Sequence, residues 1–344
     1  MNFNIFFCLK IEYNSNIVKF DMSYNPGLEL VPFGFDNMGA TCYFNSVLQS
    51  LLSCTSFIDE IIKNKERKKY NEHPVLSIII EMVELGLSFR NDIDKKREYK
   101  IRDTREISEY NQKLSNYSPR IWVAMIKLLC KKHNKRSREF MAGQQCAGEG
   151  FNYLLDSMDE FTDIQNLFLH RYCNSVQCFN CGKWISKVTS MNNIFAIPHN
   201  LESEQIKKFK HNNTPDMSQF LAKQTGYVED YICPKCKDNS EKYTVNNLTM
   251  VPEILVVLSK KYKCDEKLDV YTDFSKTLEF NGKNGKKMIY DAVSQIEHVG
   301  NLNGGHYWAI SRRYNGWYKL NDESVGDSEF KPTNNTYIVF YHLR

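Results

Sequence analysis

One cysteine stands where a helix is expected to begin, in the stretch GFDNMGATCYFNSVLQSLL from Gly34 to Leu52. This residue is Cys42. Thr41 before it suits an N-cap, and apolar residues after it recur at the spacing of one helix face: Val47, Leu48, Leu51 and Leu52. Unpaired backbone N–H groups and the helix dipole lower the pKa of a thiol in a first helical turn. Cys42 is therefore a candidate nucleophile, with a structural thiol as the alternative.

The loop that leads to Cys42 carries a candidate hydrogen-bond donor. Gly34 and Gly39 allow this loop to turn tightly. Asn37 lies on it, five residues before the cysteine. Its side-chain amide is able to donate a hydrogen bond to a developing oxyanion, so Asn37 is a candidate catalytic residue.

A second group of polar residues lies in the stretch HVGNLNGGHYWAISRRYNGWYKLNDESV. It contains His298 and His306, followed by Asn321 and Asp322. An imidazole can accept the proton of a thiol, and an asparagine or aspartate can orient the imidazole. The chain order Cys, His, Asn is that of the papain-like thiol proteases.

The register of the hairpin in this stretch decides which group reaches His306. Asn-Gly at 315–316 is typical of a hairpin turn, but a two-residue loop there would leave Asn321 roughly 13 Å from His306. A turn centred near residues 313–314, or a bulge, would bring the two side chains together. Neighbouring strand residues point to opposite faces, so we expect only one of Asn321 and Asp322 to contact His306 directly.

Four cysteines form two Cys-x-x-Cys pairs, each able to put two thiolates on one metal ion. Together the pairs predict a closed structural zinc site, and the long separation between them requires an insert in the ribbon. Two unrelated reduced pairs or a redox motif are the alternatives. The residues are Cys178, Cys181, Cys233 and Cys236.

Composition limits the class of protein. The chain has 344 residues, of which 42% are hydrophobic, and its net charge of +4 is too mild to single out nucleic acid as a partner. No window of about twenty apolar residues predicts a transmembrane helix. The apolar patch at the start is too short for a secretory signal, so we expect reduced cysteines and a location in the cytoplasm, the nucleus or both.

Helical patterns dominate up to about residue 165, and short stretches rich in β-branched and aromatic residues follow. This order predicts an α+β fold. We expect residues 1–33 to be an N-terminal extension and residues 34–344 to be one catalytic domain.

The two polar stretches together resemble the ubiquitin-specific proteases, which are papain-like cysteine deubiquitinases. The Cys box of that family reads approximately G-L-x-N-x-G-[NA]-T-C-Y-[MF]-N-S-x-L-Q, and residues 34–49 match it with Phe35 in place of leucine. The His box reads H-x-G-x-x-x-x-G-H-Y and then W-Y-x-[FL]-[ND]-D-x-x-V, which residues 298–307 and 317–325 match. The resemblance runs from near Gly34 to the end of the sequence.

This resemblance implies a papain-like architecture of thumb, palm and fingers, with a zinc ribbon in fingers that span approximately residues 166–250. It implies that Cys42 is the nucleophile, His306 the general base, Asn321 the third triad member and Asn37 the oxyanion donor. Asn321 would then contact the His306 ring, and Asp322 is expected to face away from it and to support the oxyanion region or to hold a water. His298 matches the first histidine of the His box, which is not the base.

The implied reaction is hydrolysis of the bond after the C-terminal glycine of ubiquitin, through a thioester. The expected partners are ubiquitin or ubiquitinated proteins and an activating protein, with no nucleic acid and no membrane, and we expect a monomer. A catalytically weak protein that binds ubiquitin or a ubiquitin-like protein is the alternative. A zinc ribbon that binds nucleic acid is a third interpretation, but it explains neither box.

One element departs from the family pattern. The family commonly has Q-Q-D-A-x-E-F-L, and this chain has QQCAGEGF. Cys146 replaces the aspartate, and Gly150 stands where phenylalanine is usual. The resemblance implies that this element helps to hold the arginine-containing tail of ubiquitin, so the lost carboxylate is expected to weaken tail binding.

Overall fold

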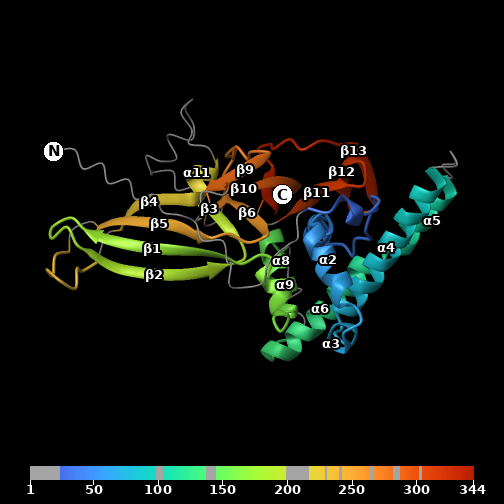
Figure 1. Ribbon diagram of the computed structural model, residues 1–344, viewed down its shortest axis with the longest axis horizontal. Coiled ribbons are helices and arrows are strands. Elements are labelled where there is room, and N and C mark those ends of the chain that lie inside the picture. Colours follow the sequence, from blue (N-terminus) through green and yellow to red (C-terminus); the bar gives the residue numbers. More distant parts are fainter. Residues whose placement is uncertain are drawn as a thin grey trace.

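The computed structural model describes residues 24–97, 104–136, 145–198, 217–228, 231–239, 242–263, 266–281, 287–301 and 304–344. Within them, helices come first and strands follow, with one later helix (Figure 1). The α-helices are α1 (Cys42–Leu51), α2 (Thr55–Asn64), α3 (Lys68–Asn71), α4 (Leu76–Arg97), α5 (Thr104–Ser115), α6 (Tyr117–His133), α8 (Ala147–Ser157), α9 (Thr162–Asn166) and α11 (Met217–Ala222). This order agrees with the α+β fold that the sequence predicts.

Two sheets carry most of the strands. The fingers sheet has the order β2-β1-β5-β4 and contains β1 (His170–Cys178), β2 (Trp184–Asn192), β4 (Lys223–Val228) and β5 (Lys242–Met250). It extends away from the thumb, which consists of the helices that precede β1 (Figure 1). A small ribbon pairs β7 (Tyr262–Lys263) with β8 (Glu266–Lys267).

The palm sheet has the order β13-β12-β11-β10-β14-β6-β3, and β9 also pairs with β10. Its strands are β3 (Phe195–Pro198), β6 (Ile254–Lys260), β9 (Thr277–Asn281), β10 (Lys287–Gly300), β11 (Gly305–Arg313), β12 (Gly316–Asn321), β13 (Ser324–Ser328) and β14 (Thr336–Leu343). Neighbours are antiparallel, except that β3 runs parallel to β6.

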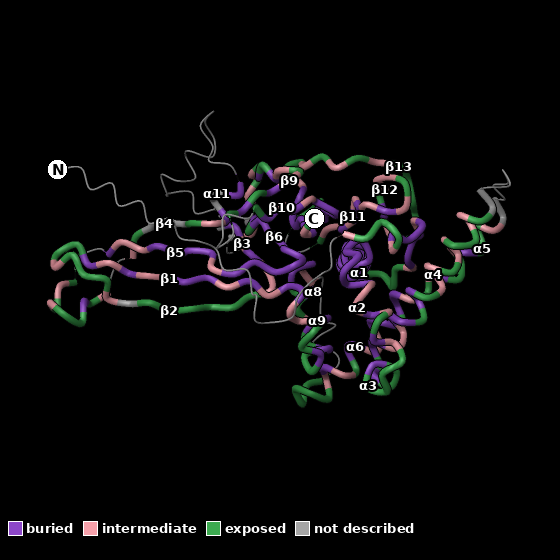
Figure 2. Tube along the Cα trace, in the orientation of Figure 1, coloured by how far each residue is buried: buried purple, intermediate pink, exposed green. Residues whose placement is uncertain are grey.

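Helix α1 lies at the junction of thumb and palm. It packs against β11 and β10 on one side and against α8 and α6 on the other, and all ten of its residues are buried (Figure 2). The spacing of its apolar residues predicts one buried face. Its polar residues are buried too because they have partners, as Gln49 shows: its Oε1 accepts a hydrogen bond from Arg313 Nη2 at 2.7 Å.

The segment before the Cys42 loop packs into the domain. Residues 24–33 belong to the stretch that the sequence assigns to an extension, but Leu30 and Phe33 are fully buried in the core. Tyr314 N also donates to Leu30 O at 3.0 Å. Residues 1–23 lie outside the described residues. No helix among the described residues has the length and apolar character to cross a membrane.

Candidate active site and metal centre

Cys42 is the first residue of α1, as the sequence predicts. Thr41 occupies the N-cap position, but its side chain makes no capping hydrogen bond to the helix. Thr41 Oγ1 instead accepts from Met38 N at 3.0 Å and contacts Asn37 Oδ1 at 3.2 Å. Thr41 is therefore the N-cap residue that the sequence predicts, but its side chain closes the loop before Cys42 and does not cap α1.

The surroundings of the Cys42 thiol differ from the sequence-based expectation. The residue is only 2% exposed. Burial raises the pKa of the Cys42 thiol above its ordinary value, while the backbone N–H of Tyr307 acts in the opposite direction. The expected lowering by the helix start is therefore outweighed by desolvation. Within the described residues, no hydrogen bond joins this thiol to the His306 ring.

His306 and Asn321 contact each other from neighbouring strands of the palm sheet. His306 is the second residue of β11, and Asn321 is the last residue of the neighbouring strand β12. His306 Nε2 lies 2.5 Å from Asn321 Oδ1, so Nδ1 is left for proton exchange with another group. This is the arrangement in which an asparagine orients an imidazole.

The hairpin register explains this contact. Arg313 pairs with Gly316, so the two central turn residues are Tyr314 and Asn315. The turn at 315–316 that the Asn-Gly pair predicts is thus wrong by one residue. Asn315 has a φ of 68°, in the left-handed region that asparagine tolerates. The register leaves Asn321 two positions along the strand from His306 instead of the four that a 315–316 turn would give, so the two side chains meet diagonally without a bulge. The expected turn at 313–314, which would place the two residues directly opposite each other, is also wrong by one residue.

Asp322 does not face away from the ring, in contrast to the expectation. Its Oδ2 lies 3.9 Å from His306 Nε2. Its Oδ1 accepts from Asn45 Nδ2 at 2.7 Å, and its Oδ2 accepts from Asn37 Nδ2 at 2.8 Å. The left-handed φ of 48° at Asp322 lets the side chain leave the strand alternation and meet the loop and α1. The carboxylate thus joins the palm hairpin to the segment around Cys42.

Asn37 lies at the candidate site, and its side-chain amide already forms several hydrogen bonds. Its Oδ1 accepts from Gly39 N at 2.9 Å and from Thr41 N at 3.2 Å, which fixes the loop. One N–H of its amide donates to Asp322 Oδ2. A side-chain amide has two N–H groups, so the second is free within the described residues to donate to an oxyanion.

Two groups at the site are not predicted from the sequence, the Asn45 side chain and the backbone N–H of Tyr307. Asn45, three residues after Cys42, donates to Asp322 Oδ1 and also to Asp36 O at 3.1 Å, and it accepts from Ser118 Oγ at 2.5 Å. The signal that would have found it is a polar residue inside an apolar helical pattern. The backbone N–H of Tyr307 near Cys42 leaves no mark in the sequence, because any residue type supplies it.

His298 has a structural role. It is 3% exposed, and its Nδ1 lies 2.6 Å from the Tyr262 hydroxyl. Its ring lies so close to Gly305 that a Cβ there would be 2.2 Å from Nε2. Burial and the nearby Lys267 lower the pKa of His298 to about 4, so it is neutral at neutral pH. The glycine before His306 is therefore required for packing.

Cys146 is the N-cap of α8. Its Sγ accepts from Glu149 N at 3.3 Å, and its own N–H donates to Glu149 Oε2 at 3.4 Å, which completes a capping box. The Tyr337 hydroxyl donates to the same sulfur at 3.5 Å. Burial raises the pKa of the Cys146 thiol. Cys146 thus fills the capping role that an aspartate would fill, but as a neutral group.

Gly150 allows α8 to approach α1. A Cβ at this position would lie 2.7 Å from the ring of Tyr43, the residue after Cys42. The Tyr43 hydroxyl accepts from Trp122 Nε1 at 3.0 Å, which holds the ring in place. The ring of Tyr43 therefore takes the space next to this glycine.

The four predicted metal ligands meet at the tip of the fingers. Their sulfur atoms all lie within 4.8 Å of one another, with 3.7 Å between Cys178 and Cys236 and 3.9 Å between Cys181 and Cys233. Four thiolates at about 2.3 Å from a tetrahedral zinc ion would be separated by about 3.8 Å. The arrangement fits such an ion.

The two Cys-x-x-Cys turns have matching backbone geometry. The residue after each pair is left-handed, with a φ of 65° at Gly182 and 59° at Lys237. Cys178 N donates to Lys183 O at 3.0 Å, and Cys233 N donates to Asp238 O at 2.8 Å. Gly182 is readable from the sequence as a turn residue. Lys237 is not, because lysine rarely adopts this conformation.

The fold, with Cys42 at the start of α1 near β11 and with His306 bonded to Asn321, is that of a cysteine peptidase of the thumb, palm and fingers type. The chain belongs to the ubiquitin carboxyl-terminal hydrolase family, whose model matches residues 33–341. It is thus a cysteine-type ubiquitin-specific peptidase by family.

Two relatives by sequence cover most of the chain. Ubiquitin carboxyl-terminal hydrolase 4 of Arabidopsis thaliana is 25% identical over 85% of this chain and 84% of its own length. Ubiquitin carboxyl-terminal hydrolase 12 of Salmo salar is 23% identical over 91% of this chain and 90% of its own length.

Solved structures share the fold. One is the SAGA DUB module of Ubp8, Sgf11, Sus1 and Sgf73 bound to monoubiquitin, with a TM-score of 0.64, 16% identity, and coverage of 95% of this chain and 72% of that chain. The same module bound to ubiquitin aldehyde has a TM-score of 0.62, 18% identity, and coverage of 94% and 71%. At this identity the likeness concerns the fold alone.

Proposed function

We propose that this chain hydrolyses the bond that follows the C-terminal glycine of ubiquitin, through a thioester on Cys42. The observation that carries the proposal is the 2.5 Å contact between His306 Nε2 and Asn321 Oδ1. It holds the imidazole on β11, beside the residue whose backbone N–H lies near the thiol. The family and the names of its relatives supply ubiquitin as the substrate.

Each residue has one part in the proposed reaction. His306 accepts the proton of Cys42, and the sulfur attacks the glycine carbonyl carbon. The free N–H of Asn37 donates to the resulting oxyanion. When the C–N bond breaks, His306 gives the proton to the leaving amine. A water molecule then loses a proton to His306 and attacks the thioester carbon. The C–S bond breaks, the Cys42 sulfur takes the proton back from His306, and ubiquitin leaves with a carboxyl group that ionises in water.

Asp322 supports this chemistry through position. Its carboxylate fixes Asn37 and Asn45 on one side and lies near His306 on the other. The same carboxylate therefore joins the loop before Cys42 to the end of β12, next to the ring that accepts the Cys42 proton. The raised pKa of the thiol makes this proton acceptor necessary at neutral pH.

A ubiquitin probe with a C-terminal electrophile and a fluorogenic ubiquitin substrate test the proposal. We expect one covalent adduct at Cys42, no adduct with Cys42→Ala, and turnover only with the unchanged thiol. Retained ubiquitin binding without adduct or turnover would instead support the alternative, a ubiquitin-binding protein without activity. Labelling at Cys54 or Cys146 would show that the nucleophile is misassigned.

We also propose that Cys178, Cys181, Cys233 and Cys236 hold one structural zinc ion. The sulfur spacing and the paired turns support it. The ion would crosslink the β1 end of the fingers to the turn before β5, with no part in the reaction itself. Metal analysis of the purified protein should give one zinc per chain, and Cys181→Ser should lower both the metal content and the melting temperature. A folded, active protein without metal would exclude this site.

A further inference from the structure

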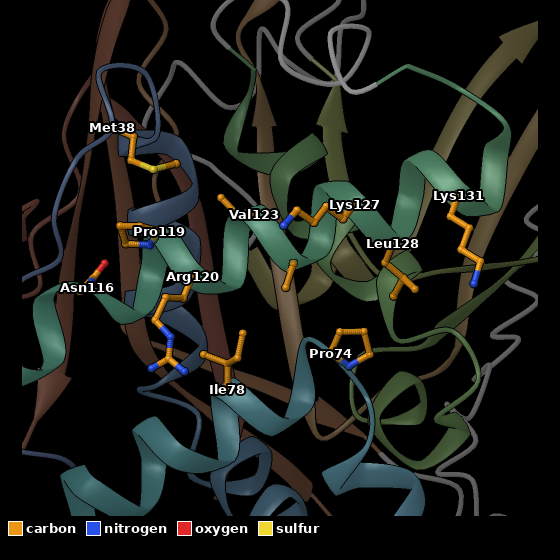
Figure 3. Close-up of a pocket in the computed structure, with 11 residues that line it drawn as sticks. Met38, Pro74, Ile78, Asn116, Pro119, Arg120, Val123, Lys127, Leu128 and Lys131 are labelled. Atoms are coloured by element: carbon orange, nitrogen blue, oxygen red, sulfur yellow. The ribbon is translucent and has the colours of Figure 1, made fainter.

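A groove on the outer side of the thumb is not used by the proposed reaction. It lies between α6 and the start of α4, and it has a volume of about 720 Å³. Figure 3 shows α6 crossing above α4, with Met38 at one end of the groove and Lys131 at the other. Its lining residues are Met38, Pro74, Ile78, Asn116, Pro119, Arg120, Val123, Ala124, Lys127, Leu128 and Lys131.

The groove has an apolar floor. Val123, Ala124 and Leu128 come from α6, and Ile78 comes from α4; all four are only partly buried. Residues on α6 that are three or four positions apart share one helix face. The exposed apolar stripe is therefore continuous along α6 and is met from below by the start of α4.

All the charged residues that line the groove are basic. Arg120 is neutralised by Glu81, at 2.9 Å. Lys127 and Lys131 are exposed, lie one turn apart, and form no ion pair within the described residues. The first N–H groups of α4 do not add to this positive surface, because Val75 N and Leu76 N donate to His73 Nδ1 at 3.3 and 3.2 Å. The two lysines are thus available to pair with acidic residues of another molecule.

The shape of the groove suits a helix. The lining follows α6 from Asn116 to Lys131, roughly 22 Å at 1.5 Å per residue. A helix that packs into the groove between two others buries residues at positions i, i+3, i+4 and i+7. The far end of such a helix would touch Met38, which is 46% exposed and whose N–H donates to Thr41 Oγ1 in the loop before Cys42.

We propose that this groove docks an amphipathic helix of a partner protein, with an apolar stripe on the floor and glutamate or aspartate residues facing Lys127 and Lys131. The proposal goes beyond the peptidase activity and does not depend on it. Charge complementarity and the length of the apolar stripe together carry it. The bound helix would end beside the loop that positions Cys42.

A fluorescence-anisotropy titration of the full chain tests this docking. The probe is a labelled peptide of roughly 18 residues, about five helical turns, made of leucine, alanine and glutamate, with leucines at helical spacing and glutamates on both flanks. We expect saturable binding that weakens as salt increases. Lys127→Glu with Lys131→Glu should weaken binding at least about tenfold, or about 1.4 kcal/mol at 25 °C.

Matched controls define the result. The charge-reversed pair Lys276→Glu and Lys331→Glu lies on the palm, at exposed positions, and should leave peptide affinity unchanged. Val123→Asp should weaken binding by placing a carboxylate on the floor of the groove. Equal binding of a scrambled peptide, or equal affinity in the Lys127 and Lys131 double variant, would overturn the proposal. Melting curves of each variant verify that it is folded.

Discussion

The helices α1 and α8 pack against each other and each begins at a cysteine, but the two thiols have different surroundings. Cys146 is an N-cap, and its sulfur accepts hydrogen bonds from Glu149 N and from the Tyr337 hydroxyl. Cys42 is one position further into its helix, and its sulfur lies near β11, the strand that carries His306. Burial raises the pKa of both thiols.

The comparison shows that the start of a helix does not by itself make a cysteine reactive. In α8 a capping box satisfies backbone N–H groups at the helix start, so the Cys146 sulfur acts as a helix cap. In α1 the N-cap side chain turns away to close the loop, and the sulfur lies near a strand with an imidazole. The feature that distinguishes the Cys42 thiol from the Cys146 thiol is the strand beside it that carries the His306 imidazole.

The largest expected effect is the loss of turnover in Cys42→Ala. Removal of the nucleophile should lower turnover of a fluorogenic ubiquitin substrate by at least about 10³-fold. Cys146→Ala is the matched control and should retain turnover within a few fold. If the two variants lost activity equally, the contrast between the helices would be wrong.

The second effect concerns the imidazole of His306. Asn321→Ala frees the ring of His306, and turnover should fall by roughly 10²-fold because general-base catalysis depends on ring orientation. The melting temperature should change little, because Asn321 is at the end of β12. A larger loss in Asp322→Asn than in Asn321→Ala would make Asp322 the orienting group.

The third effect is a gain. Cys146→Asp keeps an N-cap acceptor and adds a carboxylate to the segment that corresponds to the tail-binding element of the family. A charge-assisted hydrogen bond is worth roughly 1.5–3 kcal/mol, so KM for the ubiquitin substrate should fall by about tenfold or more. An unchanged or higher KM would show that the surroundings of Cys146 are built for a neutral group.

The fourth effect is on stability. Gly150→Ala places a methyl group within 2.7 Å of the Tyr43 ring, and overpacking of this kind costs about 1–3 kcal/mol. We expect a lower midpoint of urea unfolding. Gly326→Ala, where a Cβ would meet nothing within 4 Å, is the control. A stability equal to that of the control would mean that the two helices separate at no cost.

The smallest effect concerns the pH dependence of the Cys42 thiol. Since burial raises its pKa, the thiolate fraction should still be rising above pH 9. The rate of iodoacetamide labelling of the Cys42 peptide, measured by mass spectrometry, should therefore increase across that range. A plateau below pH 8 would indicate a preformed thiolate–imidazolium pair.

Local chemistry was readable from the sequence, whereas contacts that depend on register were not. Cys42 at a helix start, the four fingertip cysteines and the order of helices and strands follow from residue type and spacing. The contact between His306 and Asn321 depends on a turn placed one residue before the Asn-Gly pair. Asn-Gly favours a left-handed residue but does not determine whether asparagine takes the first or second turn position.

Other features depend on tertiary structure. The bonds from Asp322 to Asn37 and Asn45 join residues 285 and 277 positions apart, and no local pattern encodes them. The pKa of Cys42 depends on how deeply α1 is buried between thumb and palm. Gly150 departs from the family pattern, and its contact with the ring of Tyr43 depends on how α8 packs against α1.

The position of β14 in the palm has a consequence for biosynthesis. This strand, Thr336–Leu343, lies between β10 and β6, so the palm cannot close until one of the last segments of the described chain has left the ribosome. At a synthesis rate of about 5–20 residues per second, roughly 15–60 s separate the emergence of Cys42 from that of Leu343. For most of this interval the nascent chain has Cys42 but not yet His306, and afterwards the sheet around His306 is still incomplete. Translation therefore delays the assembly of Cys42, His306 and Asn321 into one site, and the open edges of β10 and β6 are able to pair with other strands in the meantime.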